Sequence, residues 1–146
     1  MSSERDPIPK TVQVRIEVSK GSRIKRSAAG DIDFISPLPC PWNYGSALGH
    51  QGEDGEPVDV VVLGPPIERG STRTVVLQGH IPFTDLGEVD HKWIAHSGPL
   101  TAEQIKQVET FFQRYAQAKR HAARLRSKSG STLAGSYIPW TKVGHE

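Results

Sequence analysis

Residues 58–63, which read VDVVVL, decide the fold. Apolar side chains, most of them β-branched, occupy every position but one, and a short run of this kind is typical of a central strand buried on both faces. Asp59 is the exception, because a carboxylate inside a hydrophobic strand costs free energy unless a cation or hydrogen bonds compensate it. We therefore expect a β-structured core with a functional acidic group built into it.

Further strands are expected on both sides of this stretch. Residues 12–18 alternate apolar and polar side chains with the period of two that marks a half-buried strand, which points Glu17 away from the core. Short runs separated by glycine and proline predict other strands at residues 23–27, 74–77, 79–83 and 92–95. Proline and glycine interrupt residues 36–49 heavily, and no strand is assigned there. The result is an all-β body of about five strands.

The pattern changes at Thr101, where a helix is expected to begin. Residues 101–104, TAEQ, form a capping box, and apolar residues recur on one helical face as far as Leu125. Lysine-, arginine- and serine-rich sequence follows at residues 126–131, and residues 137–140 are expected to pack back onto the body. We predict one mainly β domain with a C-terminal helix over residues 1–146, with a core at about 11–127 and tails at 1–10 and 128–146.

Composition indicates a soluble globular domain. The chain has 36% hydrophobic and 23% charged residues, and no apolar run approaches the length of a membrane span. The N-terminus lacks the apolar segment of a secretory signal, and the single cysteine, Cys40, can form no intrachain disulfide, so a cytoplasmic location is expected. The net charge of +2 is too small to indicate a nucleic-acid or membrane partner by itself.

Two short acidic segments carry the predicted chemistry. Residues 54–59, DGEPVD, place three carboxylates at the entrance of the central strand. Residues 84–92, TDLGEVDHK, follow after two predicted strands, so hairpin folding would set the segments side by side. Crowded carboxylates stay ionised only when cations neutralise them, and oxygen-only ligands favour a hard ion, Mg²⁺ or Mn²⁺ before Zn²⁺. Isolated Glu53 and Glu88 are interpreted as solvated turn residues.

In these segments the sequence resembles the soluble inorganic pyrophosphatases. The family's signature, Asp-x-Asp-Pro-x-Asp followed by an apolar residue, is matched by residues 54–60 with a glutamate at the second acidic position. Its second motif, two aspartates five positions apart and then a lysine, is matched by Asp85, Asp90 and Lys92. Further tracts match in order at residues 14–17 (VRIE), 23–25 (RIK), 43–45 (NYG) and 111–115 (FFQRY). Several motifs in the right order are more specific than one acidic hexapeptide.

The resemblance implies metal-dependent hydrolysis of inorganic pyrophosphate by in-line attack of a metal-activated water. It also implies an OB-like five-stranded β-barrel flanked by the helix, and a homo-oligomer. By this resemblance Mg²⁺, or Mn²⁺, is held by Asp54, Asp59, Asp85, Asp90 and Glu17. The catalytic residues are Glu56, which takes the proton of the water, and Asp59. Phosphate is bound by Lys25, Tyr44, Lys92 and Tyr115.

The chain departs from the family at several positions. Glu56 replaces the aspartate that polarises the attacking water. Ile32 falls where the family has a phosphate-clamping arginine, and Ala116 where bacterial members usually carry a lysine. Cys40 replaces a tyrosine and Ser27 a glutamate. The lost cations weaken the phosphate clamp unless Arg23 or Arg26 substitutes for them.

Two alternatives stay open at this point. One is a degenerate paralogue that keeps the fold and the metals but hydrolyses pyrophosphate weakly or not at all, or acts on another phosphoanhydride. The other is an OB-fold module that binds nucleic acid through the basic residues at 119–128. The predicted strands carry few aromatic residues for stacking on bases, and a basic run is equally typical of a solvated helix end, which argues against nucleic acid.

Overall fold

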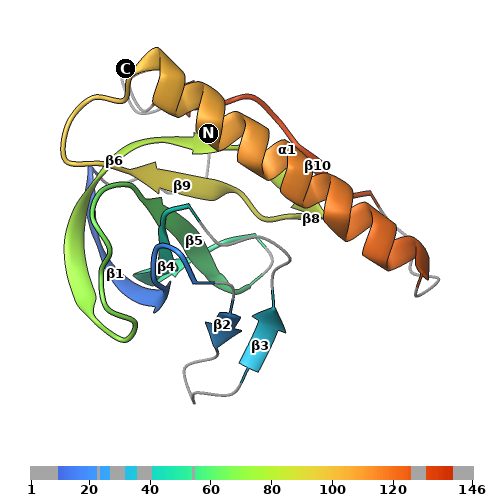
Figure 1. Ribbon diagram of the computed structural model, residues 1–146, viewed down its shortest axis with the longest axis horizontal. Coiled ribbons are helices and arrows are strands. Elements are labelled where there is room, and N and C mark those ends of the chain that lie inside the picture. Colours follow the sequence, from blue (N-terminus) through green and yellow to red (C-terminus); the bar gives the residue numbers. More distant parts are fainter. Residues whose placement is uncertain are drawn as a thin grey trace, which may run out of the picture.

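The computed structural model describes residues 10–22, 24–26, 32–35, 41–53, 55–125 and 131–139. Five strands form a closed barrel (Figure 1), and in the order of pairing they are β1 (Thr11–Val18), β4 (Asn43–Gln51), β5 (Pro57–Val62), β9 (Lys92–Ala95) and β6 (Thr72–Ile81). The barrel closes because β6 also pairs with β1. Its pairs are antiparallel except β5 with β9, which run parallel. The predicted mainly β, OB-like barrel is confirmed.

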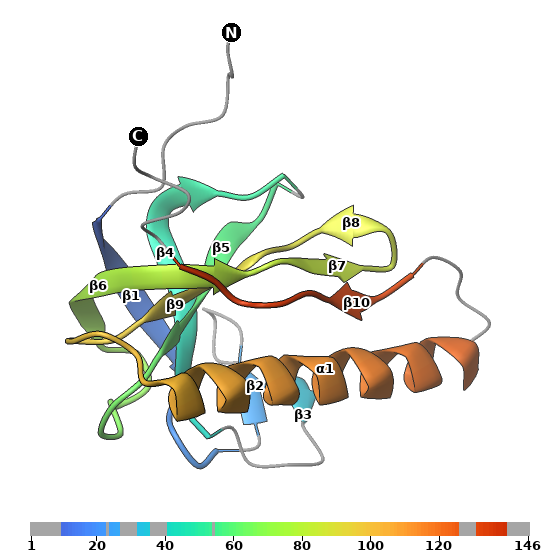
Figure 2. The same ribbon diagram turned by 90° about the horizontal axis from the view of Figure 1, so that it is seen from above.

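Smaller elements surround the barrel. The strands β2 (Ile24–Arg26) and β3 (Ile32–Ile35) pair only with each other, while β7 (Phe83–Asp85), β8 (Glu88–Val89) and β10 (Leu133–Ala134) form a small sheet in the order β10, β7, β8. A last strand, β11 (Ile138–Pro139), pairs with β6, as expected for residues that pack back onto the body. Figure 2 shows the helix α1 (Ala102–Leu125) running beside β10 and along one side of the barrel.

Two hydrophobic clusters hold these layers together, and β5 contributes to both. Val60 and Val62 belong to the cluster that fills the barrel, whereas Val61 and Leu63 belong to the cluster between the barrel and α1. The strand is therefore buried on both faces, as its sequence predicts. Because side chains alternate along a strand, Asp59 shares the outer face with Val61 and so lies on the helix side of the barrel.

The helix begins at the predicted cap. The backbone N–H of Gln104 donates to Thr101 Oγ1 at 3.1 Å, and the backbone N–H of Thr101 donates to Gln104 Oε1 at 2.9 Å. This reciprocal pattern is a capping box. Val108, Phe112 and Ala116 form its buried stripe. None of the helices in the described ranges has the length and apolar character that crossing a membrane requires.

Two predictions about strands are wrong. The proline- and glycine-rich pattern at residues 36–49 indicates no strand, yet β4 begins at Asn43. The pattern predicts separate strands at residues 74–77 and 79–83, yet β6 runs through Gly79 without ending. A Cβ at Gly79 would lie 2.4 Å from the carbonyl oxygen of Ile138, so this glycine admits the close approach of β11 and does not terminate the strand.

Candidate active site

One row of polar side chains crosses the outer face of four barrel strands. It contains Glu17 on β1, Ser46 on β4, Asp59 on β5 and Lys92 on β9. The Ser46 hydroxyl donates to Glu17 Oε2 at 2.6 Å, Ser46 is the register partner of Asp59, and Asp59 is the register partner of Lys92. Strand pairing therefore gathers residues from distant parts of the sequence onto the face that carries α1.

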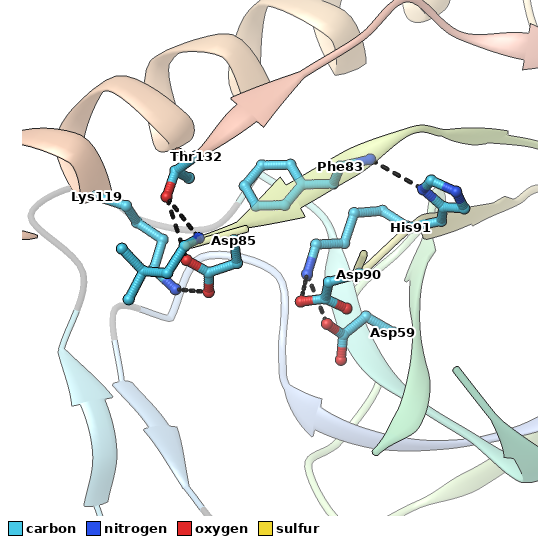
Figure 3. A network of polar contacts seen from close by, with 9 residues as sticks. Asp59, Phe83, Asp85, Asp90, His91, Lys119 and Thr132 are labelled. Atoms are coloured by element: carbon cyan, nitrogen blue, oxygen red, sulfur yellow. Dashed lines mark hydrogen bonds and ion pairs between the residues drawn. The ribbon is translucent and has the colours of Figure 1, made fainter. Parts of the chain in front are cut away.

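Lys92 binds two of the predicted metal ligands at once, Asp59 and Asp90, whose carboxylates lie side by side in Figure 3. Its Nζ lies 2.7 Å from Asp59 Oδ2 and 2.9 Å from Asp90 Oδ2, and its side chain is only 3% exposed. Burial lowers the pKa of Lys92, but the charges and hydrogen bonds of Asp59 and Asp90 outweigh it, so the pKa is raised above its ordinary value of 10.5. Lys92 is therefore a charged ammonium at neutral pH, with two carboxylates converging on it.

Two tyrosines flank this cluster. The ring of Tyr44 has its centroid 6.0 Å from Lys92 Nζ. Burial raises the pKa of Tyr44 well above 10.0, and Asp59, Tyr115 and Asp90 raise it further. The Tyr44 hydroxyl therefore keeps its proton and can donate it in a hydrogen bond to an anion.

Asn43 fixes the start of β4, directly before Tyr44. Its fully buried side chain accepts hydrogen bonds at Oδ1 from the backbone N–H groups of Lys20 at 3.0 Å and Ile67 at 2.8 Å. Its Nδ2 donates to the carbonyls of Val62 at 3.3 Å and Pro65 at 2.9 Å. One amide thus joins three chain segments at this end of the barrel and so positions Tyr44.

Asp85, at the end of β7, is held from two sides. Its Oδ2 lies 2.7 Å from Lys119 Nζ, and its Oδ1 lies 3.4 Å from Thr132 Oγ1 (Figure 3). Lys119 Nζ also lies 5.4 Å from the centroid of the Tyr115 ring. Burial lowers the pKa of Lys119, but Tyr115 and Asp85 outweigh burial and the repulsion from Lys92, so this pKa is raised as well.

The turn that follows Asp85 is strained and is supported by the C-terminal segment. Leu86 has a φ of +52° and Gly87 a φ of +88°. Positive φ values at both positions suit a two-residue hairpin turn, but leucine rarely adopts them, so the backbone at Leu86 is strained. The Leu86 N–H donates to Thr132 Oγ1 at 3.1 Å, and the Gly87 N–H donates to the carbonyl of Ser131 at 2.8 Å. Sequence reasoning missed Thr132, because its contacts with Asp85 and Leu86 depend on chain folding and the resemblance ends before it.

The structure brings together most of the predicted site residues that it describes. Asp59, Asp90, Lys92, Tyr44 and Tyr115 interact within one site, and Asp85 adjoins them through Lys119. Glu17 lies at the far end of the polar row, bonded to Ser46. Three predicted residues are not placed in it: Glu56 is exposed at the start of β5, Lys25 lies on β2 of which only the backbone is described, and Asp54 lies outside the described residues.

The positions where the chain departs from the family are only partly described. Ala116 is 1% exposed and packs in the cluster between barrel and helix, so this position faces the hydrophobic core. Lys119, one turn after Tyr115, is a helix cation that contacts Asp85. Ile32 lies on β3, of which only the backbone is described, and Ser27 and Cys40 lie outside the described residues.

The carboxylates have the donor chemistry of a site for a hard divalent cation. Within the described ranges no three acidic, histidine or cysteine side chains are grouped so that they could hold an ion. Asp59 and Asp90 contact Lys92, and Asp85 contacts Lys119. The carboxylates fit such an ion by their oxygen donors and their charge. A divalent cation there would compete with the two lysines for the same oxygen atoms.

Comparison with known proteins identifies relatives. A profile described as inorganic pyrophosphatase matches residues 7–139. A soluble inorganic pyrophosphatase of Zea mays is 28% identical over 127 residues, which cover 73% of this chain and 59% of that protein. An inorganic pyrophosphatase of Aquifex pyrophilus is 28% identical over 129 residues, which cover 73% of each chain. The chain thus spans little more than half the length of the plant relative.

Solved structures agree on the fold. The crystal structure of an inorganic pyrophosphatase from Neisseria gonorrhoeae is similar with a TM-score of 0.71 and 24% identity, covering 91% of this chain and 84% of that one. An inorganic pyrophosphatase from Helicobacter pylori gives a TM-score of 0.75 and 22% identity, covering 97% and 92%. Since the profile match extends over nearly all of the chain, this protein belongs to the inorganic pyrophosphatase family.

Proposed function

We propose that this chain hydrolyses inorganic pyrophosphate to two phosphates with the help of divalent cations, Mg²⁺ in the first place. The observation that carries the proposal is the convergence of Asp59 and Asp90 on one buried site beside Tyr44 and Tyr115. Carboxylates suit the cations, and an ammonium and phenol hydroxyls suit phosphate oxygens. Membership of the family supports the same reaction.

The proposed roles follow from charge and position. Asp54, Asp59, Asp85, Asp90 and Glu17 would hold the cations. Bound cations would supply a water of lowered pKa, about 7, and would neutralise phosphate charge. Lys92 and the neutral hydroxyl of Tyr44 bind phosphate oxygens, together with Lys25 and Tyr115.

The hydrolysis itself needs one proton acceptor. The water oxygen bonds to one phosphorus atom, the bond from that phosphorus to the bridging oxygen breaks, and the second phosphate leaves with the bridging oxygen. Glu56 accepts the proton of the water. Its exposure at the start of β5 leaves its side chain accessible to solvent water, and its side chain is one methylene longer than the aspartate of the family pattern.

Replacement of Asp59 by asparagine tests this proposal. A neutral amide is a weak ligand for a hard cation and also deprives Lys92 of a charge partner, so Asp59→Asn should lower Mg²⁺-dependent release of phosphate from pyrophosphate by about 10³-fold or more. Glu53→Gln makes the same chemical change at an exposed carboxylate nearby and should have little effect.

The outcomes separate the proposal from its alternatives. Activity of Asp59→Asn within about twofold of the unaltered chain would remove Asp59 from the site, because loss of a metal ligand costs several kcal/mol. An unaltered chain that binds Mg²⁺ and pyrophosphate but releases no phosphate would instead identify the degenerate paralogue. Nucleic-acid binding that weakens at high salt, without hydrolysis, would favour the OB-fold module.

The quaternary structure and the location are proposed from the family resemblance and the composition. We infer a homo-oligomer from the family resemblance and a cytoplasmic location from the composition and the lone cysteine. Light scattering on the purified chain measures the first, and localisation of a tagged chain in cells measures the second.

A further inference from the structure

Lys119 differs from Lys92 in its freedom to move. Lys92 binds two carboxylates and is 3% exposed, whereas Lys119 binds one carboxylate and its side chain is 32% exposed. A lysine has a flexible four-carbon stem, and its ammonium is a point charge without a fixed bonding geometry. From its anchor on α1 Lys119 can therefore change partner, and its ammonium already lies 5.4 Å from the centroid of the Tyr115 ring, a second group of the proposed site.

A divalent cation would break the contact that holds Lys119. The ammonium lies 2.7 Å from Oδ2 of Asp85, a carboxylate that the proposed function assigns to the metal. An ammonium and a divalent cation compete for one carboxylate, because the two positive charges repel each other at such a distance. A metal on Asp85 therefore releases Lys119 into a site that already contains the positive charge of Lys92.

Resting on the proposed function, we propose that Lys119 is an exchangeable phosphate-binding residue. It neutralises Asp85 while no divalent cation is bound there, and it binds a phosphate oxygen of the substrate once the cation has taken Asp85. The ligand class is a phosphate or phosphoanhydride anion, for which a free ammonium is a strong hydrogen-bond donor. Position 116 is an alanine that faces the hydrophobic core and carries no charge. Lys119, on the next turn of the helix, thereby supplies the positive charge that position 116 lacks.

Two binding measurements on the variant Lys119→Met test this exchange without turnover. Calorimetric titration with Mg²⁺ alone should show about three- to fivefold tighter binding, because the competing ammonium is gone. Titration with inorganic phosphate at saturating Mg²⁺ should show about tenfold weaker binding, because a charge-assisted hydrogen bond is lost. A lysine with a structural role alone would not move the two affinities in opposite directions.

Matched variants make the test specific. Lys106→Met removes an exposed lysine from the same helix and should change neither affinity. Lys119→Gln should reproduce the Met result, and Lys119→Arg should restore phosphate binding because it keeps the charge. In hydrolysis Lys119→Met should raise KM for pyrophosphate more than it lowers kcat.

The contrary results are distinct. Mg²⁺ binding that is weakened or unchanged in both Lys119→Met and Lys119→Gln would overturn the competition with Asp85. Phosphate binding that is unchanged in these variants would overturn the role toward substrate. An unaltered chain with no Mg²⁺-dependent phosphate binding would overturn the proposed function, and the role of Lys119 with it.

Discussion

Lys92 shows how a buried charge is accommodated at the residue scale. Within the described residues it is the one charged side chain that is buried, and the carboxylates of Asp59 and Asp90 are only 16% and 20% exposed. Taking such charges out of water is costly, and their mutual attraction compensates only while both signs are present. If any one of the three side chains is removed, the remaining charges are no longer fully compensated. The free energy of keeping them buried then lowers the stability of the fold.

We expect Lys92→Met to destabilise the metal-free chain. Two carboxylates would then face each other without a cation, which should lower the free energy of unfolding by about 1–3 kcal/mol after allowance for their partial exposure. Added Mg²⁺ should restore part of this loss, because a divalent cation replaces the missing charge. Urea unfolding with and without Mg²⁺ measures both effects, and Lys106→Met is the control.

The difference in unfolding free energy between the unaltered chain and Lys92→Met should change with pH in a defined direction. The folded pKa of Lys92 lies above its ordinary 10.5, so its pairing stabilises the fold fully below that value and is lost as pH rises through the folded pKa. The gap in unfolding free energy between the unaltered chain and Lys92→Met should thus stay constant from about pH 7 to 9 and shrink above about pH 10. A gap that already closes by pH 9 would contradict this assignment.

Single residues differ in how well the sequence predicts them. Asp59 is predictable because its immediate neighbours are valines, so the anomaly is local. Ser46 and Thr132 are not, because their partners lie 29 and 47 positions away and only strand pairing brings them within reach. A serine or threonine in a loop-rich stretch carries no sign of the carboxylate that it will bind.

At the scale of elements, the C-terminal segment supports the second acidic motif. Strand β10 pairs with β7, and Thr132, just before β10, bonds both Asp85 and the N–H of Leu86. The Arg120 guanidinium in turn donates to the Thr132 carbonyl at 2.7 Å. The segment at residues 131–134, which follows the helix, thus fixes the orientation of a proposed metal ligand.

Removal of the Thr132 hydroxyl should therefore affect both stability and metal binding. Thr132→Val keeps the shape but removes the acceptor of the partly buried hydrogen bond from the Leu86 N–H, at a cost of about 1 kcal/mol in unfolding free energy. Mg²⁺ affinity should fall as Asp85 becomes less well positioned. Thr132→Ser keeps the hydroxyl and should retain the affinity. Equal Mg²⁺ affinity in the valine and serine variants would show that the hydroxyl does not position Asp85.

Elements governed by local interactions are the ones that the sequence predicts well. The helix was predicted because its cap and its apolar stripe lie within the segment itself. Strand β4 was missed because residues 43–51, NYGSALGHQ, contain no β-branched side chain and two glycines. That strand exists because β1 and β5 pair with it on either side, which is a property of the barrel and not of its own residues.

At the scale of the whole molecule, the polar row depends on closure of the barrel. The row Glu17, Ser46, Asp59 and Lys92 exists only while β1, β4, β5 and β9 stay in register. The inner faces of β1, β4, β5 and β9 contribute to the cluster that fills the barrel, and the outer faces of β5 and β9 contribute to the cluster that holds α1. A substitution that disturbs the packing inside the barrel at β1, β4, β5 or β9 should therefore also displace the polar row on the outer face, even when it changes no residue of that row.

Gly45 offers the sharpest test of this coupling, because it lies between Tyr44 and Ser46 and points inward. A Cβ there would lie 2.1 Å from the carbonyl oxygen of Arg15 and 2.8 Å from Val14 Cγ1, so β1 and β4 would have to move apart. Overpacking against backbone should cost about 3 kcal/mol in urea unfolding, and Mg²⁺ affinity should fall with it because Ser46 and Asp59 shift together. Gly98→Ala is the matched control, since a Cβ at Gly98 meets nothing within 4 Å. If Gly45→Ala unfolds at the same urea concentration as Gly98→Ala, the barrel is not as tightly closed as described; if it is destabilised yet binds Mg²⁺ normally, the site does not depend on the barrel register.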